Sequence, residues 1–382
     1  MRGVNWLGDA VMSLPALARL RERFPGSYIC LLTQEKLAGL WERSTVVNSV
    51  VTFRAPESPF SVARRLKQIG AGIGLVLPNS PRSALELWLA RIPERIGYAK
   101  PWRTWLLTRT IPARPSATRK RSLAEISRLI EAPGRKAERP LETSRHQIHE
   151  YLDLMAAAFG TNPAPLSPEI EISEKEVSST ASKFDIPEAQ DRPIFGLNPG
   201  AEYGPAKRWP LERFISVGTQ LQRETRCRWL IFGGSGDAEL AEKAELGLRS
   251  NLSASESSAP VFNLAGKTTL RELCALLKLC RFLLTNDTGP MHVAAAVGTP
   301  VVTPFGSTSP ELTGPGLPGD TRHQLLRGTA PCSPCFRREC PIDFRCMTSI
   351  SVESVVEAVA RAKGGIHAGE HSTPTGPDKP NR

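Results

Sequence analysis

Asn286-Asp287-Thr288-Gly289-Pro290-Met291-His292-Val293-Ala294-Ala295-Ala296 is the stretch that decides the fold, because a polar turn leads from an apolar strand, residues 282–285, into a helix of small residues. The backbone N–H groups and the dipole of such a helix point beyond the carboxyl end of the strand, where ligands of open parallel sheets bind. Thr288, Gly289 and His292 are therefore candidates to contact a phosphate. Asp287 either caps the helix or positions a neighbouring group, and a plain capped helix is the alternative reading.

The length and composition of the chain fit a soluble α/β protein of two domains. It has 382 residues, of which 40% are apolar and 23% charged. No apolar run approaches the ~20 residues that a membrane-spanning helix needs. The N-terminal residues lack the apolar core and small-residue cleavage site of a signal peptide. We therefore expect a cytoplasmic protein.

The chain is basic, with a formal net charge of +11. An anionic partner is expected, and nucleic acid, a phosphorylated substrate or an acidic membrane surface would each suit this charge. No zinc-finger, RNP-type or helix-turn-helix signature is present, so we expect no nucleic-acid partner. The eight cysteines lie in a chain without an export signal, so disulfides are not expected.

Two halves of the chain alternate short apolar strands with amphipathic helices, which is the rhythm of βαβ units. We expect an N-terminal domain at residues 1–165 and a C-terminal domain at 193–350. A linker rich in Pro, Ser and Glu joins them at 166–192. In the first half, helices are expected near residues 10–24 and 82–90. The expected strands are residues 28–32, 73–77, 194–198, 229–232, 282–285 and 300–303.

Both ends and one inner segment of the chain differ from this rhythm. Only residues 1–5 precede the first Gly turn, so the first strand is expected to be truncated. Residues 113–145 are basic, Pro-rich and weakly periodic, which predicts a mobile loop or an insertion on the first domain. A final helix is expected at 351–363, packing back toward the N-terminal domain. A disordered tail is expected at 364–382.

Asp9 is the candidate catalytic residue of the first half. It follows Gly8 at the start of the helix, on the sheet edge that faces the second domain. A carboxylate in this position is commonly only a helix cap. A flexible glycine before it, however, lets a ligand approach the backbone closely. Both readings, a cap and a catalytic carboxylate, stay open at this point.

Two further loops of the second half fall on the same sheet edge as the 286–296 turn. Residues 198–210 follow the strand 194–198 and carry Lys207, which could neutralise a diphosphate or belong to a solvated basic loop. Residues 232–237 form a Gly-rich turn that ends in Asp237, within reach of a ribose hydroxyl. Three loops on one edge predict one nucleotide-sized crevice.

Cys332, Cys335, Cys340 and Cys346 form a C-x2-C-x4-C-x5-C cluster before the final helix. Four thiols in a reducing compartment match the ligand count of a closed tetrahedral zinc site, so a structural zinc is predicted that takes no part in chemistry. The wider spacing of the second pair leaves an iron–sulfur cluster, a redox disulfide or four unligated thiols as alternatives. The intervening Arg337 and Arg338 would favour thiolates in each case.

Taken together, these motifs resemble those of the lipopolysaccharide heptosyltransferases, which form glycosyltransferase family nine. The resemblance extends from residue 3 to about residue 362 in the family's order. It rests on Trp6-Leu7-Gly8-Asp9, Leu77-Pro78-Asn79-Ser80 with Arg82-Ser83, Gly200-Ala201-Glu202-Tyr203-Gly204-Pro205-Ala206-Lys207-Arg208-Trp209-Pro210, and the 286–296 stretch.

The resemblance implies a fold, a reaction and roles for single residues. The fold would be GT-B, with two Rossmann-like domains facing across a cleft, and the reaction an inverting transfer from ADP-heptose. Asp9 would be the general base and Lys207 would hold the diphosphate. On the donor side, Asp237 would lie near the ribose, and Asp287, Thr288, Gly289 and His292 would line the phosphate and heptose pocket. Asn79, Ser80 and Arg82 would lie on the acceptor side. No metal would be required for the chemistry.

The same resemblance implies the partners and the location. The acceptor would be the inner core of lipopolysaccharide at the cytoplasmic face of the inner membrane, and the reaction would add the second heptose to the first. The enzyme would be cytoplasmic or peripheral at that membrane. The alternatives are a related transferase with another nucleotide sugar or acceptor, because a fold does not determine the sugar, and a non-catalytic nucleotide-sugar-binding protein.

Overall fold

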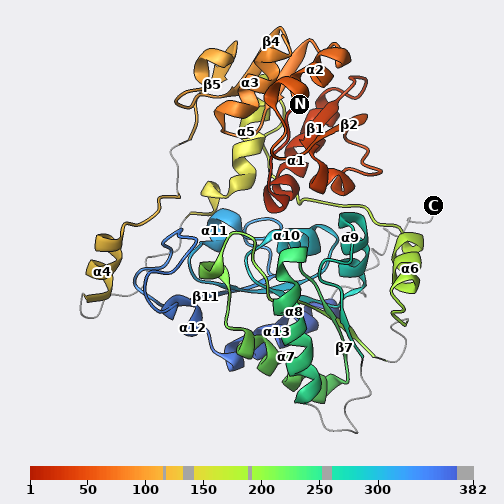
Figure 1. Ribbon diagram of the computed structural model, residues 1–382, viewed down its shortest axis with the longest axis vertical. Helices are drawn as coiled ribbons and strands as arrows, with labels where there is room; N and C mark the ends of the chain where they lie inside the picture. Colours follow the sequence, from red (N-terminus) through yellow and green to blue (C-terminus); the bar gives the residue numbers. More distant parts are fainter. Residues whose placement is uncertain (115–117, 132–141, 188–191, 252–259, 368–382) are drawn as a thin grey trace, which may run out of the picture.

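The computed structural model describes residues 1–114, 118–131, 142–187, 192–251 and 260–367. It consists of two α/β domains, one above the other in Figure 1, each built on a parallel sheet with helices on its faces. The predicted α/β class and the arrangement of two Rossmann-like domains are confirmed.

The N-terminal sheet is parallel throughout. Its strands are β1 (Cys30–Gln34), β2 (Ser49–Phe53), β3 (Ile73–Val76), β4 (Glu94–Tyr98) and β5 (Arg109–Ile111). The segment at residues 1–3 lies between β1 and β3, because Arg2 forms parallel bridges to both Leu32 and Val76. The Gly3 N–H donates to the Leu32 carbonyl at 2.8 Å. Through these contacts residues 1–3 hold the centre of the sheet.

Helices cover both faces of this sheet. One face carries α1 (Leu7–Arg23) and α5 (Gln147–Phe159), and the other carries α2 (Pro59–Ile69), α3 (Pro81–Leu89) and the short helix η2 (Thr104–Leu106). The 3-10 helix η1 (Glu35–Leu40) follows β1. Ser80 begins α3 as a side-chain cap with Pro81 at the first position, which explains why the predicted helix starts here.

The basic segment at residues 113–145 corrects one prediction. Residues 115–117 and 132–141 lie outside the described part, but Leu123–Glu131 forms the helix α4, and Thr143–Arg145 forms the 3-10 helix η3. The side chain of Ile126 is buried in the core of the C-terminal domain. For residues 118–131 the prediction of a mobile loop is therefore wrong. The reason is an apolar stripe at helical spacing, Leu123, Ile126, Leu129 and Ile130, set among basic residues.

The C-terminal sheet has six parallel strands in the order β11-β10-β9-β6-β7-β8. They are β6 (Ile194–Asn198), β7 (Arg228–Ile231), β8 (Val261–Asn263), β9 (Leu283–Thr285), β10 (Val301–Phe305) and β11 (Gln324–Arg327). From β6 the chain adds β7 and β8 on one side, and then β9 to β11 on the other side. The carboxyl ends of β6 and β9 therefore flank the point where the strand order reverses, which is where open α/β sheets bind ligands.

The helices of this half follow the predicted rhythm. They are α6 (Glu174–Lys183), η4 (Pro205–Lys207), α7 (Leu211–Thr225), η5 (Ser235–Asp237), α8 (Ala238–Ser250), α9 (Leu270–Leu279), α10 (Gly289–Ala296), α11 (Pro310–Thr313), α12 (Arg345–Thr348) and α13 (Val352–His367). The helix α6 lies within the segment predicted as linker and packs on α9.

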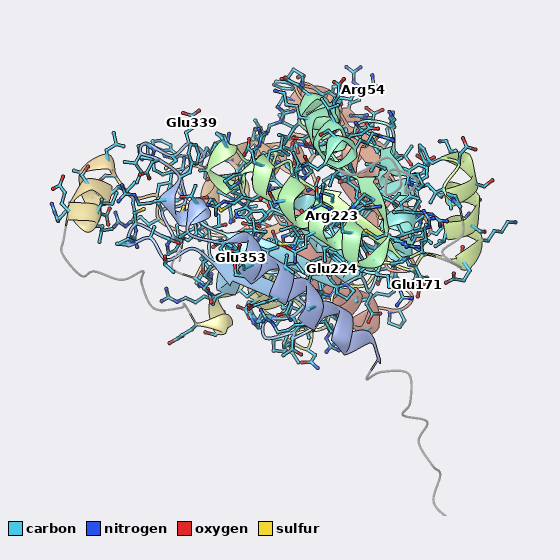
Figure 2. The ribbon with its side chains drawn as sticks, turned by 90° about the horizontal axis from the view of Figure 1, so that it is seen from below. Arg54, Glu171, Arg223, Glu224, Glu339 and Glu353 are labelled. Carbon is cyan, nitrogen blue, oxygen red and sulfur yellow. The ribbon has the colours of Figure 1, made fainter. Side chains whose placement is uncertain are left out.

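The final helix corrects a second prediction. Helix α13 packs on α7, β10 and β11, as Figures 1 and 2 show for α7, and not back toward the N-terminal domain. Its apolar side, Val355, Ala358, Val359 and Ala362, is buried in the C-terminal core. It also continues to His367, so residues 364–367 of the predicted tail are helical, and residues 368–382 lie outside the described part.

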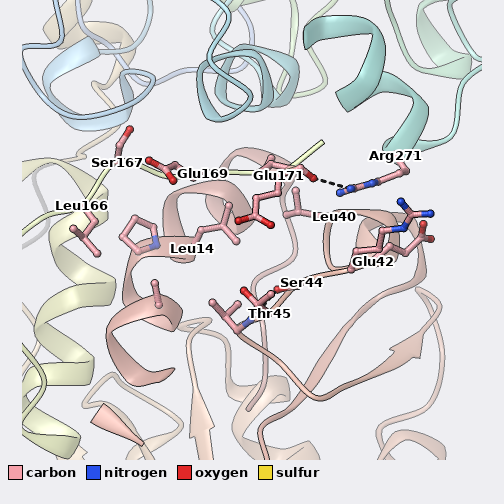
Figure 3. A pocket seen from close by; sticks show the side chains of 15 residues that line it. Leu14, Leu40, Glu42, Ser44, Thr45, Leu166, Ser167, Glu169, Glu171 and Arg271 are labelled. Carbon is pink, nitrogen blue, oxygen red and sulfur yellow. Dashed lines mark hydrogen bonds between the residues drawn. The ribbon is translucent and has the colours of Figure 1, made fainter. Parts of the chain in front are cut away.

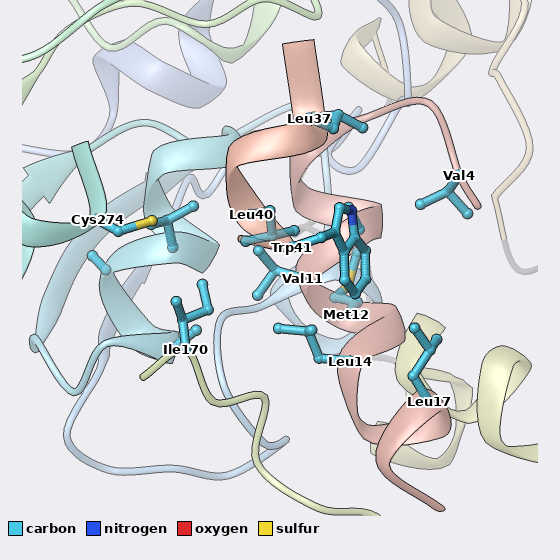
Figure 4. Close-up of a cluster of buried hydrophobic side chains, with 14 of the residues drawn as sticks. Val4, Val11, Met12, Leu14, Leu17, Leu37, Leu40, Trp41, Ile170 and Cys274 are labelled. Carbon is cyan, nitrogen blue, oxygen red and sulfur yellow. The ribbon is translucent and has the colours of Figure 1, made fainter. Parts of the chain in front are cut away.

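An apolar contact joins the two domains. Val11 and Leu14 of α1 and Leu40 of η1 belong to the same buried cluster as Ile170 of the linker and Cys274 of α9 (Figure 4). Helix α1 therefore contributes to the core of its own domain and also to the interface with the other domain.

A buried ion pair supports the centre of the N-terminal domain. The Arg2 Nε lies 2.8 Å from the Glu86 carboxylate, and both side chains are buried. The Arg2 guanidinium also donates to Asn5 Oδ1 at 3.0 Å and lies 4.4 Å from the centre of the Phe53 ring. The other carboxylate oxygen of Glu86 accepts from Arg82, which is partly exposed. This network connects the short first strand to α3.

We predict that Glu86→Gln lowers the free energy of unfolding by about 3 kcal/mol, because it leaves the buried Arg2 charge without its counter-charge. Arg82→Gln removes a partly exposed partner of the same carboxylate and should cost about 1 kcal/mol or less. Urea denaturation of both variants measures the two losses in the free energy of unfolding. Equal losses in the two variants would contradict the central role of the Arg2 pair.

Candidate active site

The loops after β6 and β9 are joined at the point where the strand order reverses. The buried Asn286 accepts a hydrogen bond at its Oδ1 from the Trp209 backbone N–H (2.9 Å) and donates from its Nδ2 to the Pro199 carbonyl (2.7 Å). One side chain therefore fixes the start and the end of the 198–210 loop against the turn that leads into α10.

Lys207 and Asp287 form a pair on these two loops. The Lys207 Nζ donates to Asp287 Oδ2 at 2.7 Å, and the Thr308 hydroxyl donates to the same oxygen at 2.6 Å. Asp287 is buried, and Lys207 also lies over the Tyr203 ring at 4.9 Å. Of the two roles considered for Asp287, the structure shows the second, because it positions Lys207. The residue at the start of α10 is Thr288, whose side chain makes no capping bond.

Asp237 brings the third loop into contact with the first. Its carboxylate accepts from the Gly234 N–H at 3.1 Å and lies 3.6 Å from the Arg208 guanidinium. A Cβ atom at Gly200 would be only 2.5 Å from Asp237 Oδ1, so a larger residue at position 200 would displace this carboxylate. The loops after β6, β7 and β9 therefore meet, as the sequence predicts.

Asp9, in the N-terminal domain, faces the loops of the C-terminal domain that carry Lys207 and Asp287. The N-terminal cap of α1 is Trp6, so Asp9 lies in the first turn and is not the cap. Its Oδ1 accepts from the Gln147 Nε2 of α5 at 3.0 Å, and that amide also donates to the Tyr151 hydroxyl at 2.9 Å. Burial raises the pKa of Asp9 from 3.8 to about 6, while the Gln147 hydrogen bond and the Lys207 charge partly oppose this rise.

Two glycines allow the domains to meet this closely. A Cβ atom at Gly8 would lie 2.7 Å from His292 Cδ2, and a Cβ atom at Gly289 would lie 2.8 Å from Leu7 Cβ. The first turns of α1 and α10 are therefore in direct contact. His292 is buried under this contact, and burial lowers its pKa to about 4, so the imidazole is neutral at neutral pH.

A pocket of about 240 Å³ on the N-terminal side contains Asp9 together with Asn79 and Ser80. Its remaining walls come from the first turn, from the ends of β3 and β4, and from Gln147, Glu150 and Tyr151 of α5. Arg82 does not line it, because its guanidinium binds Glu86 and the Glu57 carbonyl. Sequence reasoning missed the α5 residues, since nothing in their local pattern distinguishes them from an ordinary helix face.

A second hollow, of about 280 Å³, lies between α1, η1 and the linker (Figure 3). Its polar side chains include Glu42, Glu169 and Arg271, and Arg271 donates to the Glu171 carbonyl at 2.7 Å. It contains none of the candidate site residues, so the smaller pocket beside Asp9 is the candidate active site.

The four clustered cysteines lie together in the structure. Cys332, Cys335, Cys340 and Cys346 line one narrow pocket with Ile126 of α4, and all four are free thiols. Within the described residues, no group of three or more His, Cys, Asp or Glu side chains is placed to hold a metal ion. The structural zinc stays a prediction.

Burial acts against the expected ionisation of these cysteines. It raises the pKa of Cys332, Cys335 and Cys346, the last to about 12, and so opposes the expected preference for thiolates in the absence of a bound metal. Arg337 points elsewhere and donates to the Arg121 carbonyl at 3.0 Å, while Arg338 lies over the Tyr203 ring.

Comparison with known proteins agrees with this geometry. The sequence profile of glycosyltransferase family 9 (heptosyltransferase) matches residues 116–344. Lipopolysaccharide heptosyltransferase 2 of Salmonella typhimurium is 31% identical over 321 residues, which cover 82% of this chain and 84% of the relative.

Two solved structures have the same architecture. Escherichia coli ADP-heptose lipopolysaccharide heptosyltransferase II superposes with a TM-score of 0.73 at 26% identity, covering 96% of this chain and 98% of the other. Escherichia coli heptosyltransferase WaaC with ADP superposes with a TM-score of 0.65 at 16% identity, covering 95% of this chain and all of the other. At that identity, the second match shows the fold alone.

The fold and the site therefore define a GT-B glycosyltransferase. The chain belongs to glycosyltransferase family 9, the heptosyltransferase family. In the part of the chain that the structure describes, no helix combines the length and apolar character that crossing a bilayer requires.

The raised pKa of Asp9 gives a prediction that needs no substrate. An NMR titration of the Asp9 carboxyl carbon should show a midpoint near pH 6 instead of 3.8. Gln147→Leu should move this midpoint higher, because it removes a hydrogen bond that stabilises the carboxylate. A midpoint near 4 in the unsubstituted protein would show that the carboxylate is well solvated.

Metal analysis tests the predicted structural zinc. Protein purified without added metal and without a metal-binding tag should contain stoichiometric zinc or iron, and a Cys332→Ser, Cys335→Ser variant should lose it. A metal content far below one equivalent in the unsubstituted chain would leave the four residues as buried thiols only.

Proposed function

We propose that this protein transfers a heptose from ADP-heptose to the inner core of lipopolysaccharide, adding the second heptose to the first. The main observation behind the proposal is that Asp9 of the N-terminal domain faces the Lys207–Asp287 pair of the C-terminal domain. Its membership of the heptosyltransferase family and the names of its relatives, lipopolysaccharide heptosyltransferase 2 and ADP-heptose lipopolysaccharide heptosyltransferase II, support the same donor and acceptor.

In this proposal Asp9 is the general base. With a pKa of about 6, its carboxylate is ionised at neutral pH and is basic enough to accept the proton of an acceptor hydroxyl. The hydroxyl oxygen forms a bond to the anomeric carbon while the bond from that carbon to ADP breaks, and the proton goes to Asp9. Because base and leaving group lie on opposite domains, attack from the face opposite ADP gives inversion.

The leaving group is stabilised by groups of the C-terminal domain. Lys207 supplies positive charge to the diphosphate, and Thr288 and Gly289 add the N-terminus of α10. These groups provide the charge that the departing ADP needs, so we propose that the chemistry requires no metal. Asp287 holds Lys207, the neutral His292 supports the wall of the donor pocket, and Asp237 receives the ribose.

The pocket beside Asp9 receives the acceptor in this proposal. Asn79 and Ser80 line it, whereas Arg82, for which the family resemblance also implies a place on the acceptor side, is engaged by Glu86. Since the acceptor carries a lipid, we propose that the enzyme works at the cytoplasmic face of the inner membrane, as a peripheral protein.

One experiment tests donor, acceptor and activity together. The purified protein is incubated with ADP-heptose and a set of lipopolysaccharide cores truncated at successive sugars, and the products are analysed by mass spectrometry. We expect a mass increase of one heptose only on the core that ends in a single heptose. Transfer from another nucleotide sugar would replace the proposed donor, and binding of ADP-heptose without transfer to any core would indicate a non-catalytic protein.

Asp9→Asn should reduce turnover by about 10²–10⁴-fold, because the amide cannot accept the proton. Affinity for ADP, measured by calorimetry, should stay unchanged, and the melting temperature should not fall, since burying an amide costs less than burying a carboxylate. Near-normal turnover in this variant would exclude Asp9 as the base.

Lys207→Ala should weaken ADP binding and slow turnover, because it removes a charge-assisted contact with the leaving group. Lys243→Ala is the matched control, since Lys243 forms an exposed ion pair with Glu239 on α8. If the two variants had the same ADP affinity and turnover, the diphosphate would have to bind elsewhere.

A further inference from the structure

Large exposed aromatic side chains gather on one layer of the N-terminal domain. Phe60 of α2, Trp88 of α3, and Trp102 and Trp105 in the β4–β5 connection are exposed by 70, 44, 84 and 68%. They lie on the layer formed by α2, α3 and η2, whose inner sides share one apolar cluster. We call this layer, at the top of the molecule in Figure 1, the aromatic face.

The aromatic side chains of this face are held outward. Trp102 has a φ of +64°, a left-handed conformation that is costly for a bulky residue, and its side chain is the most exposed of the large apolar ones in the described chain. Trp105 contacts Trp88 edge to face, with ring centres 6.2 Å apart. Helix α3 and the short helix η2 thus present one continuous apolar surface, formed by Trp88 and Trp105, to the exterior.

The same part of the chain is strongly basic. Residues 54–114 contain eleven Lys and Arg but only three acidic residues, so they hold +8 of the total charge of +11. The three acidic residues are all engaged: Glu86 is buried against Arg2, Glu57 pairs with Arg65, and Glu94 lies 3.9 Å from Arg109. Arg64 and Lys67 of α2 and Arg91 after α3 are exposed.

The aromatic face adjoins the pocket that contains Asp9. Tyr98, at the end of β4, lines this pocket, and Trp102 follows four residues later. The buried Arg103 donates to the Pro78 carbonyl, and Pro78 is also part of the pocket wall. A molecule that rests on the aromatic face would therefore be close to the opening of the acceptor pocket.

We propose that the aromatic face docks on an anionic lipid bilayer, with Trp102 and Trp105 at the membrane interface and Arg64, Lys67 and Arg91 against the lipid phosphates. Tryptophan rings favour the boundary between water and hydrocarbon, and exposed basic residues are drawn to anionic lipids. The proposal rests on the proposed function, because a lipid-linked acceptor is presented at such a surface. The exposed positive charges of Arg64, Lys67 and Arg91 favour an anionic lipid surface over a protein partner.

Co-sedimentation of the full chain with vesicles tests this without donor or acceptor. The vesicles are phosphatidylcholine alone or phosphatidylcholine with phosphatidylglycerol. Binding should require phosphatidylglycerol and weaken with salt. Trp102→Ser with Trp105→Ser should reduce the partition coefficient about tenfold or more, since two interfacial anchors are lost. Arg64→Gln, Lys67→Gln and Arg91→Gln together should reduce it roughly hundredfold, because each basic residue contributes about fivefold.

Matched controls use exposed residues of the other domain. Leu246→Ser controls for the loss of an exposed apolar side chain, and Arg223→Gln with Lys243→Gln and Arg249→Gln controls for the charge. These variants should bind vesicles as the unsubstituted protein does. Circular dichroism confirms that every variant is folded.

Two outcomes would overturn the proposal: vesicle binding that the tryptophan and charge variants leave unchanged, or a protein that binds no vesicles but dimerises through the aromatic face. In a transfer assay, the tryptophan variant should lose activity on acceptor embedded in vesicles and keep it on delipidated acceptor. Intact vesicle binding without transfer to any acceptor would contradict the proposed function and leave the docking surface standing.

Discussion

The arrangement of the site depends on the direct contact between the first turns of α1 and α10, which is possible because Gly8 and Gly289 have no side chains. This contact places a carboxylate of one domain within electrostatic reach of a cation of the other, and burial raises the pKa of Asp9. A side chain at either glycine would force the helices apart, and the carboxylate would return toward its solvated behaviour.

Buried charges on each side of the contact are held by partners within their own domain. In the C-terminal domain, Asp287 is shared by Lys207 and Thr308. In the N-terminal domain, Arg2 is paired with Glu86 and also donates to Asn5, just before the turn that leads to Asp9. The two halves of the site are therefore each preorganised before they meet, so that little rearrangement is needed when charge develops between them.

The features that the sequence predicts well are those fixed by chain direction. Loops that follow parallel strands must fall on one edge, so the meeting of Lys207, Asp237 and Asp287 could be anticipated, as could the opposing place of Asp9. Features that depend on which surfaces pack together could not be predicted from the sequence. An amphipathic pattern shows that α13 and α4 have an apolar side but not which domain it covers. Likewise, the sequence does not show that Arg82 turns to Glu86, or that Gln147, 138 positions away, reaches Asp9.

The position of α4 affects how this protein can be divided. The helix comes between β5 and α5 of the N-terminal domain, yet its Ile126 completes the core of the C-terminal domain beside the four cysteines, and the preceding Arg121 N–H donates to the Cys335 carbonyl at 3.1 Å. The chain therefore crosses the domain boundary out and back before the linker crosses it again. A chimera of two relatives joined within the linker would place a foreign α4 on the cysteine loop, so the two halves cannot be exchanged as independent modules unless residues 118–131 stay with the C-terminal domain.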